Sequence, residues 1–233
     1  MKNIASVFDK QSRDMFKNPM VLIMFIIFPV IALIMGNLTD GVPGMEANAL
    51  MMAGMFAGMA IIQSVTSIIA EDKENQSIKF LTMAGVKPTE YILGISGVIL
   101  MFGAVSSVAF GLIAGFVGTE FWVFVGLLKA VVIAASLVGG IIALGAGNAQ
   151  SANGLGTPIG MVFGFVPMIA QFNESVAQWA RFVFTQQINA VGMLFMFGGE
   201  GVQEQIAESF AVVGGNVLVL LVVFVWVFRK KGI

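Results

Sequence analysis

The sequence predicts an all-α integral membrane protein that forms one domain over residues 1–233 and crosses the membrane six times. Apolar residues make up 58% of the chain and charged residues only 11%, whereas a soluble domain carries roughly 25% charged residues. The charges also cluster, which leaves six stretches close to or above the roughly 20 apolar residues that a membrane-spanning helix needs. These stretches are rich in Gly and Ala and lack the alternation of barrel strands, so we expect helices at about 20–38, 47–70, 91–119, 121–147, 154–171 and 210–228.

Lys and Arg in the short connecting segments predict the orientation of these spans. Ten of the twelve basic residues precede the first span, lie at 71–90, or follow the last span. Because short cytoplasmic loops carry an excess of Lys and Arg, we expect both termini and the 71–90 segment to lie in the cytoplasm of a multi-pass cell-membrane protein.

The first 18 residues predict an amphipathic helix on the cytoplasmic surface. It bends into the first span at Asn18-Pro19, and its flanks are basic. A frayed, solvated tail is the alternative. The face that carries the prediction consists of Ile4, Val7, Phe8, Gln11 and Met15.

The segment 172–208 on the outer side is harder to assign. Ile188–Gly199 is apolar over 12 residues, which is too short to cross the membrane alone. Joined to Val176–Gln187 it would form a seventh span, bury Arg181 and move the C-terminus outside. We expect instead an outer helix followed by a re-entrant or interfacial segment.

The longest polar segment on the inner side is 71–90, EDKENQSIKFLTMAGVKPTE. Residues Glu71–Met83 predict a short helix that Gly85 and Pro88 end. Three or four residues would connect two spans, so a solvated hairpin explains the length poorly. Ile78, Phe80 and Leu81 are expected to be exposed, and exposed apolar residues favour a docking site for a cytoplasmic partner.

Several motifs in this frame are typical of one family. Asn18-Pro19 and Phe28-Pro29 mark the first span, and the basic C-terminal end follows the last. Between spans 2 and 3 come the run Glu71-Asp72-Lys73-Glu74, then Ser77, Ile78 and Leu81, and then Val86, Glu90, Tyr91, Leu93 and Gly94. The whole chain thereby resembles the permease subunits of type-2 ATP-binding cassette exporters. It departs from them at Gln76, where Gly is usual, in lacking a basic residue just after Gly94, and in the missing proline pattern before span 6.

The resemblance implies a permease that performs no ATP chemistry. Two copies, identical or paralogous, would pair in the lipid membrane, and ATPase subunits that bind ATP and Mg would dock on the 71–90 helix to drive export. The coupling residues would be Glu71, Asp72, Lys73, Glu74, Ser77, Ile78, Phe80 and Leu81. Nucleic acid is not an expected partner.

Residue counts exclude much other chemistry. The chain has no Cys, no His and no G-x-x-x-x-G-K-[ST] run. Disulfides, Cys/His metal sites, Ser-His or Cys-His catalysis and a P-loop are therefore impossible, and we expect no cofactor bound by this chain.

Small residues four apart in span 5 allow close helix approach. Gly156, Gly160 and Gly164 predict either packing within the chain, for example against span 2, or a dimer interface around a two-fold axis. A substrate path beside them would be mainly apolar and would favour an amphiphilic or hydrophobic drug, peptide or lipid. Its expected lining is Met55, Met59, Gln63, Met161, Phe165 and Met168.

Two other functions remain open on the sequence alone. An ion-coupled secondary transporter needs ionisable groups deep in the membrane, and Lys129 is the one such group. Its side chain either serves a function there or extends toward Glu120 at the surface. A membrane anchor or sensor is also compatible with the 71–90 helix. Co-purification with an ATPase would separate the exporter from both.

Overall fold

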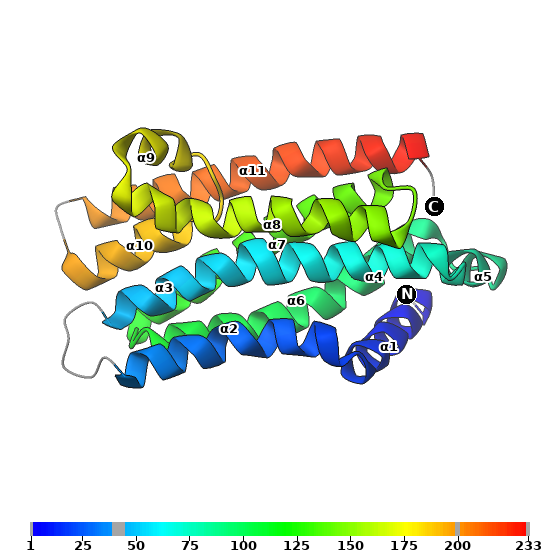
Figure 1. Cartoon of the computed structure of the whole chain (residues 1–233), viewed down its shortest axis with the longest axis horizontal. Helices are drawn as coiled ribbons and strands as arrows, with labels where there is room; N and C mark the ends of the chain where they lie inside the picture. The colour runs from blue at the N-terminus through cyan, green and yellow to red at the C-terminus, as the bar shows by residue number, and fades with distance from the viewer. Residues whose placement is uncertain (1, 39–44, 199–200, 232–233) are drawn as a thin grey trace.

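The computed structural model describes residues 2–38, 45–198 and 201–231, and all regular structure in this part of the chain is helical (Figure 1). Span 2 consists of three consecutive pieces, α3, the π-helical segment η1 and α4. The elements are α1 (Lys2–Lys17), α2 (Pro19–Leu38), α3 (Met45–Met55), η1 (Phe56–Ile61), α4 (Ile62–Glu74), α5 (Ser77–Met83), α6 (Pro88–Ile113), α7 (Gly118–Gly145), α8 (Ala149–Phe172), α9 (Glu174–Ala180), α10 (Gln186–Phe197) and α11 (Val202–Lys231).

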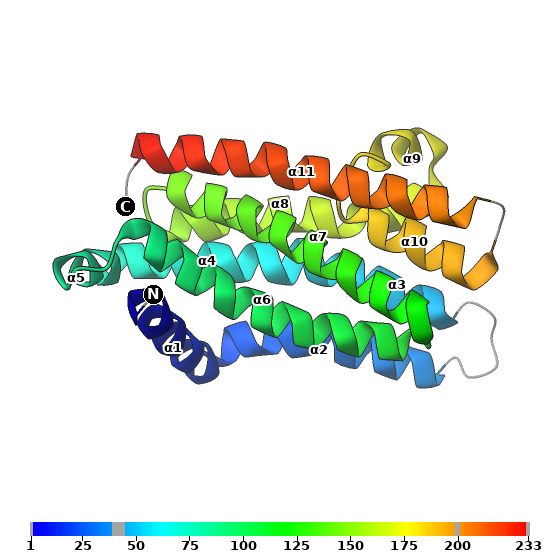
Figure 2. The same ribbon diagram turned by 180° about the vertical axis from the view of Figure 1, so that it is seen from behind.

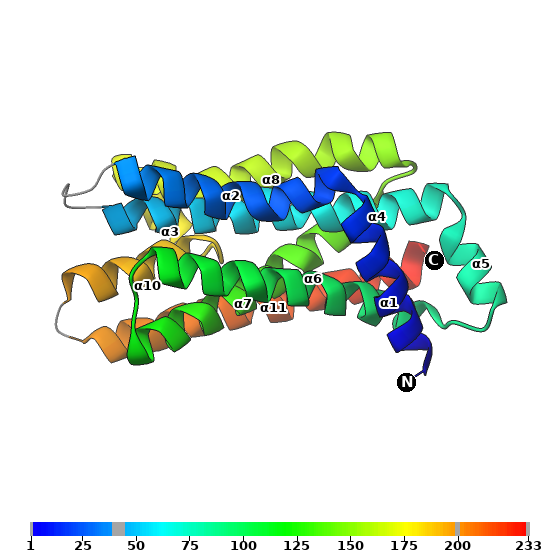
Figure 3. The same ribbon diagram turned by 90° about the horizontal axis from the view of Figure 1, so that it is seen from below.

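The long helices form a bundle of two layers. In one layer, span 2 lies between α2 and α8, and in the other, α7 lies between α6 and α11 (Figures 1 and 3). Span 2 packs on α7, which joins the layers through the most buried part of the molecule. Figure 2 shows the second layer from its own side, with α7 crossing between α6 and α11.

Among the residues that the structure describes, five helices are long and apolar enough to cross a membrane, and α1 with α2, bent by 67° near the Asn18-Pro19 step, supplies a sixth candidate. The chain is therefore a multi-pass membrane protein, as the apolar runs predict. Ten basic residues lie at one end of the bundle, on α1, around α5, and in the last turn of α11 (Figure 1). We call this the basic end, and the other the opposite end.

The connection between spans 3 and 4 lies earlier in the chain than expected. The apolar run predicts a helix over 91–119, but α6 ends at Ile113 and α7 begins at Gly118. Gly115 and Gly118 have φ values of +73° and +59°, which L side chains rarely adopt and glycine adopts freely. Hydropathy does not show this break because the residues of the turn are themselves apolar.

The amphipathic helix α1 buries its apolar face against protein as well as lying across the basic end. Val7, Gln11 and Met15 are all nearly inaccessible. A Cβ built on Gly94 of α6 would lie 2.5 Å from Val7 Cγ1, so the absent side chain lets α1 seat on α6. The sequence predicts that this face of α1 lies on the membrane surface. In the structure α6 covers much of the face, so the prediction describes the surroundings of α1 only in part.

The segment after span 5 contains two short helices and no seventh span. α9 ends at Ala180, a turn covers Arg181–Thr185, and α10 packs against α3, α7 and α11 at the opposite end (Figure 2). Trp179 of α9 is largely exposed, whereas Ile188 and Val191 of α10 are buried. A single span over residues 176–199 is thus excluded by the turn that interrupts it.

Candidate functional site

The predicted helix Glu71–Met83 is two helices. α4 continues from span 2 to Glu74, and Asn75 and Gln76 form a turn before α5 begins at Ser77. Gln76 has a φ of 56°, in the left-handed region that glycine adopts freely and other residues rarely do. The turn separates the charged run, at the end of a span, from the apolar residues of α5.

Asp72 joins three helices at the basic end. Its side chain is buried, and its Oδ2 accepts hydrogen bonds from the Gln11 amide of α1 and, at 2.8 Å, from the Tyr91 hydroxyl of α6. Lys10 of α1 donates to Oδ1 at 3.1 Å. Burial of Lys10 opposes its charge, but the carboxylates of Asp72 and Asp14 outweigh burial and raise its pKa above the ordinary value. The ammonium therefore stays protonated beside Asp72.

Lys73 and Glu74 contact two further helices at this end, α7 and α8. The Lys73 ammonium donates to Ala146 O at 2.8 Å and to Ala143 O and Leu144 O at 3.4 Å, at the C-terminus of α7. Glu74 Oε2 accepts from the backbone N–H of Ala149 at 2.9 Å, in the first turn of α8. A cation at a helix C-terminus and an anion at an N-terminus both suit the helix dipole.

These contacts correct one expectation for the charged run. Asp72, Lys73 and Glu74 bind groups of their own chain rather than forming a free rim around a docked partner, although Glu71 is exposed. We call the three residues the hub, because they tie α4 to α1, α6, α7 and α8.

The apolar residues of α5 divide between two faces. Ile78 is only 4% exposed and Leu81 half-buried, so the expected exposure of Ile78 is wrong. Phe80 and Met83 are 64% and 76% exposed, and both lie near the end of the molecule. We call this pair the tip. Met83 was missed as a docking candidate, although its three-residue spacing from Phe80 puts both on one helical face.

The turn that follows α5 is fixed by polar contacts. Asn3 of α1 donates to Gly85 O at 3.2 Å and to Glu90 Oε2 at 3.0 Å. Glu90 Oε2 also accepts from the backbone N–H of Lys87 at 2.9 Å, which completes the N-terminus of α6. The tip is thus connected to α1 and α6 on one side and to the hub on the other.

The glycine stripe of span 5 packs against span 2 of the same chain. Gly156, Gly160 and Gly164 are buried, and a Cβ on Gly164 would lie 2.9 Å from Met59 Cγ. A Cβ on Gly58 would reach 2.2 Å from the Gly164 backbone nitrogen. Span 2 of the same chain already covers these three glycines, so they are not free to form the alternative, a dimer interface.

The expected path residues lie along this contact between span 2 and α8, which we call the seam. Met55, Met59, Phe165 and Met168 are half-buried and Met161 is exposed. The π-helical segment also runs along the seam, and nothing in the sequence pattern indicates it. π-Helical turns occur frequently at functional sites.

Gln63, the sixth path residue, belongs to a polar cluster on the seam. It donates to Asn153 Oδ1 at 2.9 Å and accepts from the Thr157 hydroxyl at 3.2 Å, while Ser67 donates to Asn153 Oδ1 at 2.7 Å. Ser67, Asn153 and Thr157 are not among the residues that the sequence predicts for the path. Their signal is a polar pair four residues apart on each of two packed helices, Gln63 with Ser67 on α4 and Asn153 with Thr157 on α8.

Comparison with known proteins gives a clear family match. The family model described as ABC-2 type transporter matches residues 2–186, which cover α1 through the start of α10. No curated protein matches the chain. The match includes the hub, the tip and the seam.

Proposed function

The chain belongs to the ABC-2 type transporter family, and we propose that this membrane subunit is the permease of an exporter, driven by ATPase subunits that dock on the tip. Membership makes it a membrane subunit of an ABC transporter, with an ATP-binding cassette ATPase as its partner. The basic end would face the cytoplasm, because Lys and Arg gather there.

The observation that carries the proposal is the connection between the tip and the hub. Phe80 and Met83 offer apolar surface that nothing in the described chain covers, and a turn of two residues links their helix to the end of span 2. A displacement of α5 by the ATPases would therefore reach α1, α6, α7 and α8 through Asp72, Lys73 and Glu74. Such packed polar networks transmit motion because they have few alternative arrangements.

Transport would run along the seam, at the interface of two permease copies. The layer of α2, span 2 and α8 has an exposed apolar face, with Ile26 and Leu33 of α2 and Met161 of α8 each more than one-third exposed. Two such faces around a two-fold axis would enclose a space lined by methionines and the Gln63 cluster. Apolar walls with a few polar groups suit an amphiphilic or hydrophobic substrate such as a drug, peptide or lipid.

Truncation of Phe80 tests the docking. We expect Phe80→Ala to weaken co-purification of the cognate ATPase and to lower ATP-dependent transport, with normal membrane insertion. Phe16→Ala is the matched control, because Phe16 of α1 is also 64% exposed at the basic end but lies away from the tip. Equal ATPase recovery with wild type and with Phe80→Ala/Met83→Ala would contradict docking at the tip.

The same experiment addresses the other functions. A secondary transporter or an anchor would move its solute, or sit in the membrane, without recovering an ATPase. Lys129 is exposed on α7, in the layer away from the seam. That placement gives no support to ion coupling along the proposed path.

A further inference from the structure

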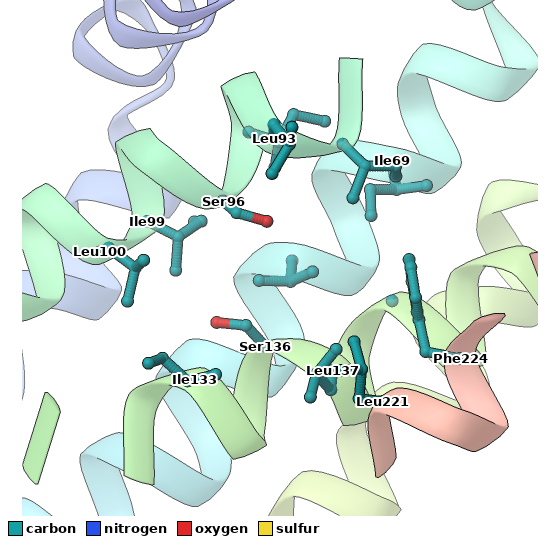
Figure 4. A pocket seen from close by; sticks show the side chains of 14 residues that line it. Ile69, Leu93, Ser96, Ile99, Leu100, Ile133, Ser136, Leu137, Leu221 and Phe224 are labelled. Atoms are coloured by element: carbon teal, nitrogen blue, oxygen red, sulfur yellow. The ribbon is translucent and has the colours of Figure 1, made fainter. Parts of the chain in front are cut away.

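α6 and α7 separate toward the basic end. Near the opposite end they are close, since a Cβ on Gly103 would lie 2.8 Å from Val132 Cγ1 and one on Gly111 would lie 2.9 Å from Phe121. Nearer the basic end a cavity of about 180 Å³ lies between the two helices, with Val65 at its inner wall and Phe224 of α11 at its edge. We call this cavity the wedge (Figure 4).

The walls of the wedge are apolar. They consist mainly of Ile, Leu and Val side chains, and the hydroxyls of Ser96 and Ser136 point into the gap from α6 and α7 (Figure 4). The Ser136 hydroxyl is already satisfied by Val132 O at 2.7 Å. Such walls suit hydrocarbon rather than a hydrated solute.

The shape of the wedge selects a thin occupant. A transmembrane helix is about 10 Å wide with its side chains, and the wedge closes where Val132 meets Gly103. Helix–helix contacts in membranes also favour small residues, and the one glycine in the lining, Gly140, is covered by Phe224. A single acyl chain fits where a helix does not.

Positive charge follows the wedge along α11, toward the basic end. Leu221 and Phe224 line it from α11, and Lys231 follows Phe224 by seven residues, or about two turns on the same face. Lys231 is near enough to Lys73 for their charges to repel. In the described part of the chain Lys231 forms no ion pair, whereas Lys73 is held by backbone carbonyls and Lys230 lies over the Trp226 ring.

We propose that the wedge binds one acyl chain of an anionic phospholipid whose phosphate is held by Lys231. The site lies mainly among α6, α7 and α11, and its lining includes none of the residues proposed for the transport path, although Val65 and Ile69 of span 2 form its inner wall. The inference requires the basic end to lie at a membrane surface, whichever surface that is.

Native mass spectrometry of the purified permease tests the site with phosphatidylglycerol and phosphatidylcholine of identical chains. We expect the wild-type permease to retain phosphatidylglycerol in preference to phosphatidylcholine. In Lys231→Gln this preference should fall on the order of fivefold, because one Lys at a membrane surface attracts anionic lipid by about that factor. The control is Lys17→Gln on α1, an exposed lysine at the basic end that does not line the wedge. This control should keep the preference.

The acyl part is tested by filling the wedge after folding. Because the chain has no Cys, Ser96→Cys can be modified selectively with a dodecyl methanethiosulfonate, and the unmodified variant reports correct folding. Modification should reduce retention of both lipids. Unchanged lipid retention after modification would overturn the proposal. So would equal retention of the two lipids by wild type, or a loss of the phosphatidylglycerol preference in Lys17→Gln as large as that in Lys231→Gln. Release of a bound membrane protein instead of lipid would also overturn it.

Discussion

Replacing Asp72 by Asn should loosen α1 from the bundle. The side chain keeps its size but loses its charge and one acceptor oxygen. In the native protein Gln11 and Tyr91 both donate to Oδ2, and Lys10 donates to Oδ1. The Asn side chain has one acceptor oxygen, and it preserves more hydrogen bonds when that oxygen faces Gln11 and Tyr91. The hydrogen bond from Lys10 is then lost. Hydrogen bonds to a charged group contribute about 1.5–3 kcal/mol and neutral ones about 0.5–1.5 kcal/mol. Weakening two bonds costs about 1 kcal/mol each, and losing the contact with the partly exposed Lys10 costs up to about 1 kcal/mol, which gives a total of about 2–3 kcal/mol.

The assay follows the exposure of α1. Val7 is buried against Gly94, so a cysteine at position 7 reacts with maleimide only when α1 detaches. A cost of about 2 kcal/mol raises the population of the detached form roughly 30-fold, and the labelling rate should rise with it. ATP hydrolysis and transport should become less tightly coupled in the same variant.

Two comparisons make the reasoning about Asp72 refutable. Asp14→Asn removes a half-exposed partner of Lys10 and should cost less than about 1 kcal/mol. Tyr91→Phe and Asp72→Asn share one hydrogen bond, so the double variant should cost less than the sum. An unchanged labelling rate in Asp72→Asn, or strict additivity of the pair, would show that Asp72 does not hold α1.

Further predictions concern the seam and the orientation. Gly58→Ala should strongly lower the yield of folded protein, because its Cβ would meet the Gly164 backbone. The control is Gly214→Ala on α11, whose Cβ would meet no atom within 4 Å and which should be neutral or slightly stabilising. Equal yields of the two variants would contradict the close approach of span 2 and α8. A Cys in place of Lys231 should be labelled from the cytoplasmic side only, and labelling from outside intact cells would invert the topology. Cys in place of the exposed Met161 should cross-link two permease copies across the proposed two-fold axis, and failure while another span cross-links would move the interface away from α8.

The sequence predicts the membrane spans well because each depends on a long apolar run, which the bilayer requires whatever the packing. Span ends are less predictable. The turn at Ala114–Val117 lies inside an apolar run. The π-helical segment of span 2 packs against α8, and no local pattern indicates it.

The candidate site shows the same division. The segment between Glu71 and Glu90 stands out as polar and too long for a simple hairpin, so its location follows from the sequence. The partners of Asp72, Lys73 and Glu74 lie on four other helices, and sequence spacing does not reveal them. Ile78 and Phe80 lie two residues apart and therefore on nearly opposite faces of α5. The turn before α5, with Gln76 in the left-handed region, sets how the helix is oriented and hence which face is buried.

Site-specific cross-linking from the tip tests the central claim most directly. A photoreactive residue in place of Met83 should form an adduct with the ATPase in the assembled complex, and the same residue in place of Phe197 should form none, although Phe197 is equally exposed and lies at the opposite end. An intact complex that yields an ATPase adduct from position 197 and none from position 83 would contradict coupling through α5.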